Sequence, residues 1–184
     1  MEKTTEHILI KNTIKGDVQS FKKIVISYNM MVYTLAYRVL KNREEAEEVT
    51  QDVFLKVYQS LHSFNMKSKL STWIYRITYN SSINKVKSQK RQFETTEINR
   101  DNEYSAYISD DTQNTISDEE TRKTINGAIL KLPEVDRIII TLYYYEELSV
   151  KEIADITSIS VQNVKIKLYR SRKKLFNELK DKVN

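Results

Sequence analysis

Two long stretches of the chain carry basic side chains and no acidic ones. Residues 53–93 contain eight Lys and Arg residues without an Asp or Glu, and residues 156–177 contain six. Residues 92–120, by contrast, hold nine acidic residues and one basic residue. Because a Lys or Arg placed on a phosphate releases condensed counterions, this distribution favours binding to a polyanion such as nucleic acid. Ordinary solvated helix faces are the alternative, although such faces usually carry both signs of charge.

The residue types that most catalytic sites need are missing or badly spaced. The chain has no Cys, two Gly and one Pro, and its two histidines, His7 and His62, are far apart. These features exclude thiolate metal sites, cysteine nucleophiles and glycine-rich phosphate loops. We therefore expect no catalytic residue, metal ion, cofactor or small-molecule substrate, and we expect that the protein is not an enzyme. A helical phosphodiesterase or nuclease is an alternative that would need clustered metal ligands.

The pattern of hydrophobic residues predicts an all-α protein. The chain has 184 residues, of which 40% are hydrophobic, which suits one medium domain or two small ones. Hydrophobic residues recur at three- and four-residue steps, and the scarcity of Gly and Pro argues against a turn-rich β fold. No hydrophobic run approaches the ~20 residues that a membrane span needs, and the first residues lack the apolar stretch of a signal peptide. We expect a cytoplasmic protein.

Capping residues predict where the helices of the first half begin. Asp17 is placed to cap a helix that continues to about residue 39, and Asn42 with Glu45 forms a capping box for the next one. Residues 63–71 break the periodicity and predict a loop, and a further helix is expected over residues 72–90.

A long polar segment separates the two halves. Residues 92–117 have no sustained apolar face, which predicts a flexible acidic linker. Ser117 with Glu120 then predicts the start of a second module. The sequence thus predicts two small helical domains, at residues 1–91 and 118–184.

The second module ends in a pattern typical of a helix-turn-helix. Ser149 with Glu152 caps a short helix, a break follows at residues 157–159, and Ser160 caps a longer basic helix. Amides and bases early in such a helix can contact base edges, and later cations suit phosphates. An antiparallel helix pair without DNA-binding function is the alternative. The candidate DNA-binding residues are Ser160, Gln162, Asn163, Lys165, Lys167, Tyr169, Arg170, Arg172 and Lys173.

Residues 132–175, LPEVDRIIITLYYYEELSVKEIADITSISVQNVKIKLYRSRKKL, resemble domain four of a bacterial extracytoplasmic-function (ECF) sigma factor of the sigma-70 family. The resemblance implies that the last helix binds the promoter −35 element. Two features depart from the family pattern: Thr157-Ser158 replaces the usual Leu-Gly, and Ile166 replaces a small polar residue on the reading face. The preferred bases are therefore not predicted.

The first module resembles domain two of the same family. Residues 45–58 are similar to the helix that docks on the clamp of core RNA polymerase, which implies docking roles for Glu48, Gln51 and Asp52. These residues share one helix face, opposite Val49 and Val53, and an ordinary solvated face is the alternative.

Residues 64–80 resemble the loop and helix that capture the melted −10 element. Bases on single-stranded DNA are held by a basic groove, by stacking and by hydrogen bonds to their edges. Lys85 adds positive charge to this region, and Trp73 could serve mainly as a core residue. The candidate −10 residues are Lys67, Lys69, Thr72, Trp73, Arg76, Tyr79, Asn80, Asn84 and Lys87.

Together these features predict a promoter-specificity subunit that binds core RNA polymerase and promoter DNA. The resemblance also implies an anti-sigma factor, often anchored in the membrane, as a partner. A stand-alone helix-turn-helix repressor or activator is the alternative function.

Overall fold

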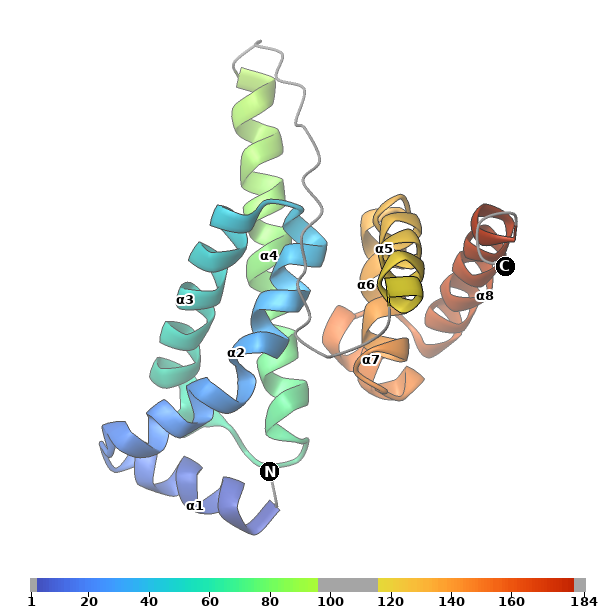
Figure 1. Ribbon diagram of the computed structural model, residues 1–184. Helices are drawn as coiled ribbons and strands as arrows, with labels where there is room; N and C mark the ends of the chain where they lie inside the picture. Colours follow the sequence, from blue (N-terminus) through green and yellow to red (C-terminus); the bar gives the residue numbers. More distant parts are fainter. Residues whose placement is uncertain (1–2, 96–115, 181–184) are drawn as a thin grey trace. The chain divides into compact units, whose positions relative to one another are not determined.

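The computed structural model describes the backbone of residues 3–95 and 116–180, and the side chains of residues 5–89 and 121–180. All regular structure in these ranges is helical, and the chain divides into two compact units (Figure 1). The first unit is built mainly of α1 (Lys3–Ile14), α2 (Val18–Leu40), α3 (Arg43–Ser60), the 3-10 helix η1 (Leu61–Ser63) and α4 (Leu70–Thr95). The second is built mainly of α5 (Ile116–Leu130), α6 (Glu134–Tyr144), α7 (Val150–Thr157) and α8 (Val161–Leu179). The all-α prediction is confirmed.

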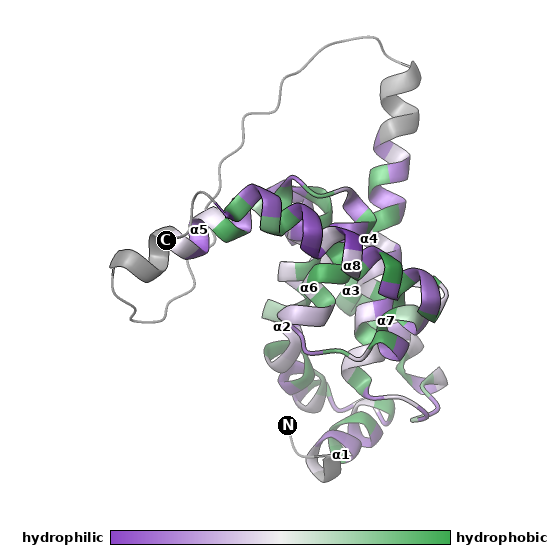
Figure 2. Ribbon diagram, turned by 90° about the vertical axis from the view of Figure 1, so that its right-hand side faces the viewer, coloured by the Kyte–Doolittle hydropathy of each residue, from purple (hydrophilic) through white to green (hydrophobic). Residues whose placement is uncertain are grey.

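The first unit has its own hydrophobic core between α1, α2, α3 and α4. Ile24, Val32, Val53 and Ile74 are fully buried in one continuous cluster. Along each helix, hydrophobic positions alternate with hydrophilic ones at helical spacing (Figure 2). This arrangement turns one side of α3 and α4 inward and leaves the other side exposed.

Both predicted caps of this unit are present. The Asp17 side chain accepts a hydrogen bond of 3.0 Å from the backbone N–H of Gln19, and the Asn42 side chain accepts one of 3.0 Å from Glu45. The hydrogen bond from the Ser20 hydroxyl to Asp17 lowers the pKa of the Asp17 carboxyl below its usual value. The cap therefore stays ionised, the form that a helix N-terminus favours.

Helix α1 was not predicted from the sequence. Its buried residues Leu9, Ile10 and Thr13 lie at helical spacing, but the stripe is too short to stand out among polar neighbours. The turn into α2 requires Gly16, whose φ of +94° lies in the region that side chains with a Cβ rarely adopt.

The second unit has a separate core formed by α5, α6, α7 and α8. Ile139, Leu142, Ile153 and Val164 are fully buried. The predicted short helix, break and long helix are confirmed as α7, a turn and α8.

The capping predictions of the second unit are confirmed in part. The Ser149 hydroxyl accepts from the Glu152 backbone at 3.2 Å, and the Glu152 carboxylate accepts from the Ser149 backbone at 2.9 Å. Ser160 accepts from the backbone of Asn163 at 3.3 Å. The prediction that Ser117 caps α5 was wrong, because α5 begins at Ile116 and already includes Ser117.

Two details of the helix-turn-helix concern its turn and the start of α8. Ser158 has a φ of +58°, so a residue with a Cβ occupies the left-handed position where the family pattern has Gly. Val161 is an apolar residue in the first turn of α8, and it is 43% exposed.

The ends of the predicted linker are helical. Helix α4 continues to Thr95 and α5 begins at Ile116, whereas the linker was placed at residues 92–117. The rest of the predicted linker lies outside the described residues. None of the described helices is long and apolar enough to cross a lipid bilayer.

Replacing Gly127 with Ala should stabilise the second unit. Gly127 lies inside α5 without a positive φ, and a Cβ built there meets no atom within 4 Å. Since Gly in a helix interior costs ~1 kcal/mol relative to Ala, we expect the free energy of unfolding of this unit to rise by ~0.5–1 kcal/mol in a urea titration followed by circular dichroism. Gly16→Ala, in the first unit, should have the opposite sign and destabilise that unit, because the φ of Gly16 is positive. A destabilised Gly127→Ala variant would contradict this account.

Candidate nucleic-acid and polymerase interface

Helix α4 presents a polar stripe on its outer side. Arg76, Asn80 and Lys87 are exposed and lie one or two turns apart, while Ile74 and Thr78 are buried on the opposite side. Asn84 is also exposed, and Tyr79 is half-buried. The stripe combines positive charge with amide groups that can contact phosphates and base edges.

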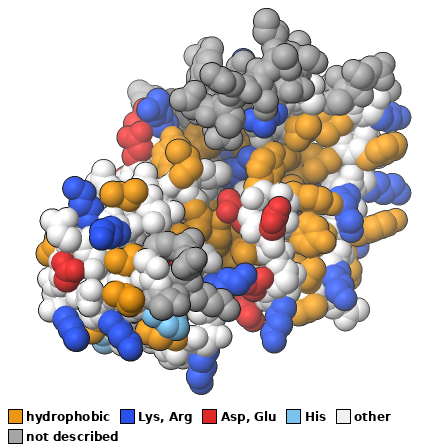
Figure 3. Space-filling model, turned by 60° about the horizontal axis from the view of Figure 1, so that its bottom comes forward, with side chains coloured by type: hydrophobic (Ala, Val, Ile, Leu, Met, Phe, Trp, Pro, Cys, Tyr) orange, Lys and Arg blue, Asp and Glu red, His pale blue; other side chains and the backbone are white. Residues whose placement is uncertain are grey.

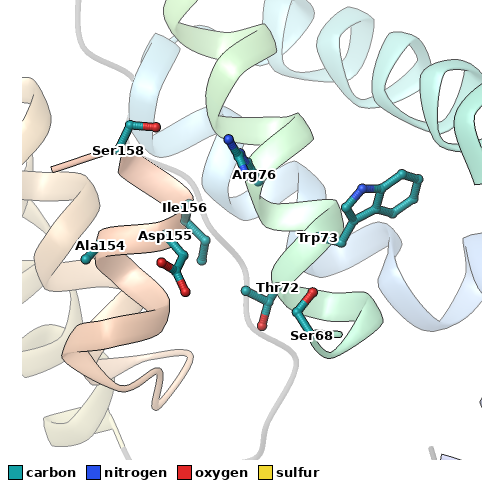
Figure 4. Close-up of a pocket in the computed structure, with 8 residues that line it drawn as sticks. All are labelled: Ser68, Thr72, Trp73, Arg76, Ala154, Asp155, Ile156 and Ser158. Atoms are coloured by element: carbon teal, nitrogen blue, oxygen red, sulfur yellow. The ribbon is translucent and has the colours of Figure 1, made fainter. Parts of the chain in front are cut away.

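The first turn of α4 packs mainly against the core of the first unit. Trp73 is half-buried and packs on the core of this unit, with its ring centroid 5.2 Å from that of Phe64. Figure 4 shows the Trp73 ring on one side of α4 and Arg76 on the other. Thr72, one turn before Arg76, is buried. The geometry favours the core interpretation of Trp73.

A short ordered loop precedes α4. The side chain of Asn65 accepts a hydrogen bond of 3.1 Å from the backbone N–H of Lys67, and Met66 between them has a φ of +58°. Both Lys67 and Lys69 are exposed on this loop. The Asn65 turn therefore holds two cations next to the polar stripe of α4.

The three predicted docking residues lie on the outer side of α3. Glu48, Gln51 and Asp52 are all exposed, and Val49 and Val53 are buried behind them. The structure thus brings the three side chains onto one face, as the spacing predicted.

Glu48 also has a partner within the unit. Its two carboxylate oxygens accept hydrogen bonds of 2.8 and 2.7 Å from Nζ of Lys85 on α4. This hydrogen bond, together with the negative charges of Glu48, Glu45 and Asp52, raises the pKa of the Lys85 ammonium above its usual value. Lys85 therefore links α4 to α3, and it does not lie on the outer stripe of α4 where the sequence had grouped it with DNA-binding cations.

Leu55 lies on the same face of α3 as the three predicted docking residues, and it was not predicted from the sequence. Its side chain is 55% exposed, and it follows Gln51 by one helical turn. A signal was available, because a Leu at the register of Glu48 and Gln51 cannot reach the core on the Val49–Val53 side. Leu55 therefore adds an exposed apolar group to this face of α3.

Helix α8 separates a buried side from a basic side. Val164, Leu168 and Ser171 are buried against the other helices of the second unit. Basic and hydrophobic side chains alternate on the right of Figure 3, the side on which α8 lies in Figure 1. The exposed side carries all but one of the predicted DNA-binding residues, namely Ser160, Gln162, Asn163, Lys165, Tyr169, Arg170, Arg172 and Lys173.

Lys167 is the exception among the predicted DNA-binding residues. Its Nζ lies 2.8 Å from Oδ1 of Asp136 on α6, and the Asp136 side chain is only 10% exposed. Lys167 is thus turned toward its own unit, whereas Lys165, Arg170 and Lys173 make no ion pair with any described residue. The pair ties the middle of α8 to α6.

The described residues contain no group of three His, Asp or Glu side chains close enough to hold a metal ion. What the surfaces of α3, α4 and α8 offer is charge, amides and exposed apolar groups, which suit binding to macromolecules.

Comparison with known families gives two matches in chain order. The model of sigma-70 region 2 matches residues 24–92, and the model of sigma-70, region 4, matches residues 122–175. The ECF RNA polymerase sigma factor SigW of Bacillus subtilis is 36% identical over 178 residues, covering 94% of this chain and 95% of the relative. The ECF RNA polymerase sigma-E factor of Escherichia coli K12 is 29% identical over 184 residues, covering 97% of this chain and 96% of the relative.

Solved structures show the same fold. The sigma factor RpoE of Bartonella quintana, crystallised with the anti-sigma factor NepR, superposes with a TM-score of 0.75 at 20% identity, covering 89% of this chain and 98% of that one. CnrH in complex with the cytosolic domain of CnrY gives a TM-score of 0.68 at 19% identity, covering 97% of this chain and 99% of that one.

Proposed function

Because the chain belongs to the ECF sigma factors of the sigma-70 family, and so is a promoter-specificity subunit of RNA polymerase, we propose that its two units divide the work of promoter recognition. The unit of α1–α4 docks on core polymerase and holds the melted −10 element, and the unit of α5–α8 binds the −35 duplex. Sigma factors are specificity factors of transcription initiation, and polymerase carries out the chemistry. The protein itself has no catalytic role in this proposal.

This division of roles is supported by the placement of the polar surfaces on separate helices. In the first unit, the acidic face of α3 and the basic stripe of α4 lie on different helices, so that one can contact a protein while the other contacts DNA. An unpaired strand suits α4, because the amides of Asn80 and Asn84 can reach base edges only after unstacking. In the second unit, α8 carries amides in its first turn and cations further on, as a major-groove helix requires.

The test of the function is transcription in vitro with purified core polymerase. We expect initiation at discrete start sites only when both core enzyme and this protein are present, and mapping those sites identifies the −35 and −10 sequences. The protein alone should bind promoter duplex weakly. Tight duplex binding without polymerase, and no transcription with it, would favour a stand-alone repressor and overturn the proposal.

Two cations of α8 should contribute to −35 binding in different ways. Lys165 lies in the first turns of the helix, where a side chain can approach base edges, and Arg170 lies more than one turn later, where it suits a phosphate. Arg170→Ala should weaken binding to all sequences and reduce the salt slope by about one phosphate. Lys165→Ala should relax sequence preference by ~1–3 kcal/mol at one base pair.

Binding of the holoenzyme to a panel of −35 variants at several salt concentrations separates the two effects. Lys15→Ala is a control of equal charge, because Lys15 is an exposed cation of the first unit, in the turn between α1 and α2. Equal effects of Lys165→Ala and Arg170→Ala on every sequence would show that the helix is oriented differently on DNA.

We also propose an anti-sigma factor as a partner. One solved structure of similar fold is the sigma factor RpoE bound to the anti-sigma factor NepR, and another is CnrH bound to the cytosolic domain of CnrY. A membrane-anchored anti-sigma factor would hold this cytoplasmic protein at the membrane until release.

A further inference from the structure

We propose that Ile166 determines part of the −35 specificity by contacting the C5-methyl group of a thymine in the major groove. This inference rests on the proposed function of the second unit, and it adds the chemical group that the unit recognises.

Ile166 lies near the centre of the exposed side of α8. The buried side of the helix is defined by Val164, Leu168 and Ser171. Ile166 lies on the opposite side, and 39% of its surface is exposed. Gln162 precedes Ile166 by four residues and Tyr169 follows it by three, so the three side chains form one row on the outer surface. A side chain in the middle of this row is the one that a helix inserted in the major groove brings closest to the bases.

Two ion pairs fix the rotation of α8 that exposes Ile166. In the middle of the helix, Lys167 is held by Asp136 at 2.8 Å, and Asp136 is nearly buried. Near its end, Glu178 is held by Lys131 at 2.7 Å. Because Lys167 is the next residue after Ile166 and faces α6, Ile166 cannot turn inward without breaking the Asp136 pair. The apolar side chain is therefore presented outward by the fold.

The surroundings of Ile166 indicate which chemical group it meets. Lys165, Arg170 and Lys173 flank it, and these cations favour a polyanion over an apolar protein partner. An aliphatic side chain cannot hydrogen-bond to a base edge. The apolar group that the major groove displays is the methyl group of thymine, which makes van der Waals contact with such side chains. Burying one methyl group is worth ~0.8 kcal/mol, equivalent to about a fourfold change in affinity.

The decisive experiment changes the DNA and leaves the protein intact. After the cognate promoter has been mapped, each thymine of its −35 element is replaced in turn by deoxyuridine, which lacks only the C5-methyl group. The affinity of the holoenzyme, made from core polymerase and the full chain, is measured for each duplex. We expect that replacing one particular thymine by deoxyuridine weakens binding of the natural holoenzyme about fourfold. The same replacement should not weaken binding of holoenzyme carrying Ile166→Ser. Phe176→Ser is the matched control, because Phe176 is a 68% exposed apolar residue on the same helix, ten residues further on; it should keep the fourfold penalty.

Two results would overturn the inference. The first is that no deoxyuridine substitution weakens binding by more than about 1.5-fold, which includes the case of a −35 element without thymine. The second is that the penalty persists in Ile166→Ser. Neither result contradicts the proposed function if scrambling the whole −35 element still weakens promoter binding by the natural holoenzyme. If scrambling has no effect, the proposed role of the second unit fails, and this inference fails with it.

Discussion

A protein with Gln51 replaced by Ala and Asp52 replaced by Lys should bind core RNA polymerase at least ~30-fold more weakly than the natural chain. Both residues are exposed on α3, and the buried Val49 and Val53 behind them are unchanged. The double change removes an amide and reverses a charge on the proposed docking face. Truncating one partner of an interfacial charge pair costs ~2–5 kcal/mol, and the lower end of that range corresponds to the ~30-fold loss.

The affinity is measured by titrating the fluorescently labelled protein with core polymerase, and circular dichroism checks that the helices are retained. Glu44→Lys is the control, because it makes a similar charge reversal at an exposed position in the first turn of α3. We expect less than a twofold effect from it. Unchanged polymerase binding by the double variant would remove the docking role from this face of α3.

The helices that carry these surfaces were largely predictable from local sequence. Asp17, Asn42, Ser149 and Ser160 cap the helices that they were expected to cap, because a cap depends on a side chain and a backbone group only two or three residues apart. The inward face of α3, with Val49 and Val53, followed from three- and four-residue spacing, which is also a local property of the sequence. Helix α1 was missed since its stability comes from packing on α2, and its own hydrophobic stripe is short.

The pairing of side chains from distant helices was not predictable. Lys85 and Lys167 belong to the acid-free stretches and were both expected to face DNA. Each is instead held by an acid from another helix, Glu48 for Lys85 and Asp136 for Lys167. Charge counted along the sequence does not show which cations the fold turns inward, because that depends on how two helices pack. The same packing leaves Leu55 exposed, which only its register with Glu48 and Gln51 indicated in advance.

The second large effect concerns strand selection by the first unit. A fragment of residues 1–95 retains α1 to α4 and the whole buried cluster of this unit, so it should fold without the rest of the chain. We expect it to bind the non-template −10 strand at least ~10-fold more tightly as single-stranded DNA than as duplex. The outer stripe of α4 offers amides for base edges, and unstacking a base costs a few kcal/mol that the isolated fragment must supply on intact duplex.

Fluorescence anisotropy with both DNA forms at matched salt measures this preference, and variants separate its two sources. Asn80→Ala should reduce discrimination between −10 sequences more than overall affinity, because Asn80 is an exposed amide on the stripe. Lys67→Ala should reduce overall affinity more than discrimination between −10 sequences, because a loop cation contacts the phosphates of any sequence. Lys15→Ala, which removes an exposed cation next to the α1–α2 turn, is the control and should change neither.

Strand preference is also what separates a sigma factor from a repressor with the same helix-turn-helix. A repressor gains all its specificity from duplex, so a first unit that served only to dimerise or to regulate would have no reason to favour unpaired bases. Duplex binding by the 1–95 fragment that equals or exceeds single-strand binding would therefore contradict strand capture by α4. In that case the exposed amides of Asn80 and Asn84 would need another partner, and promoter melting would have to depend on polymerase alone.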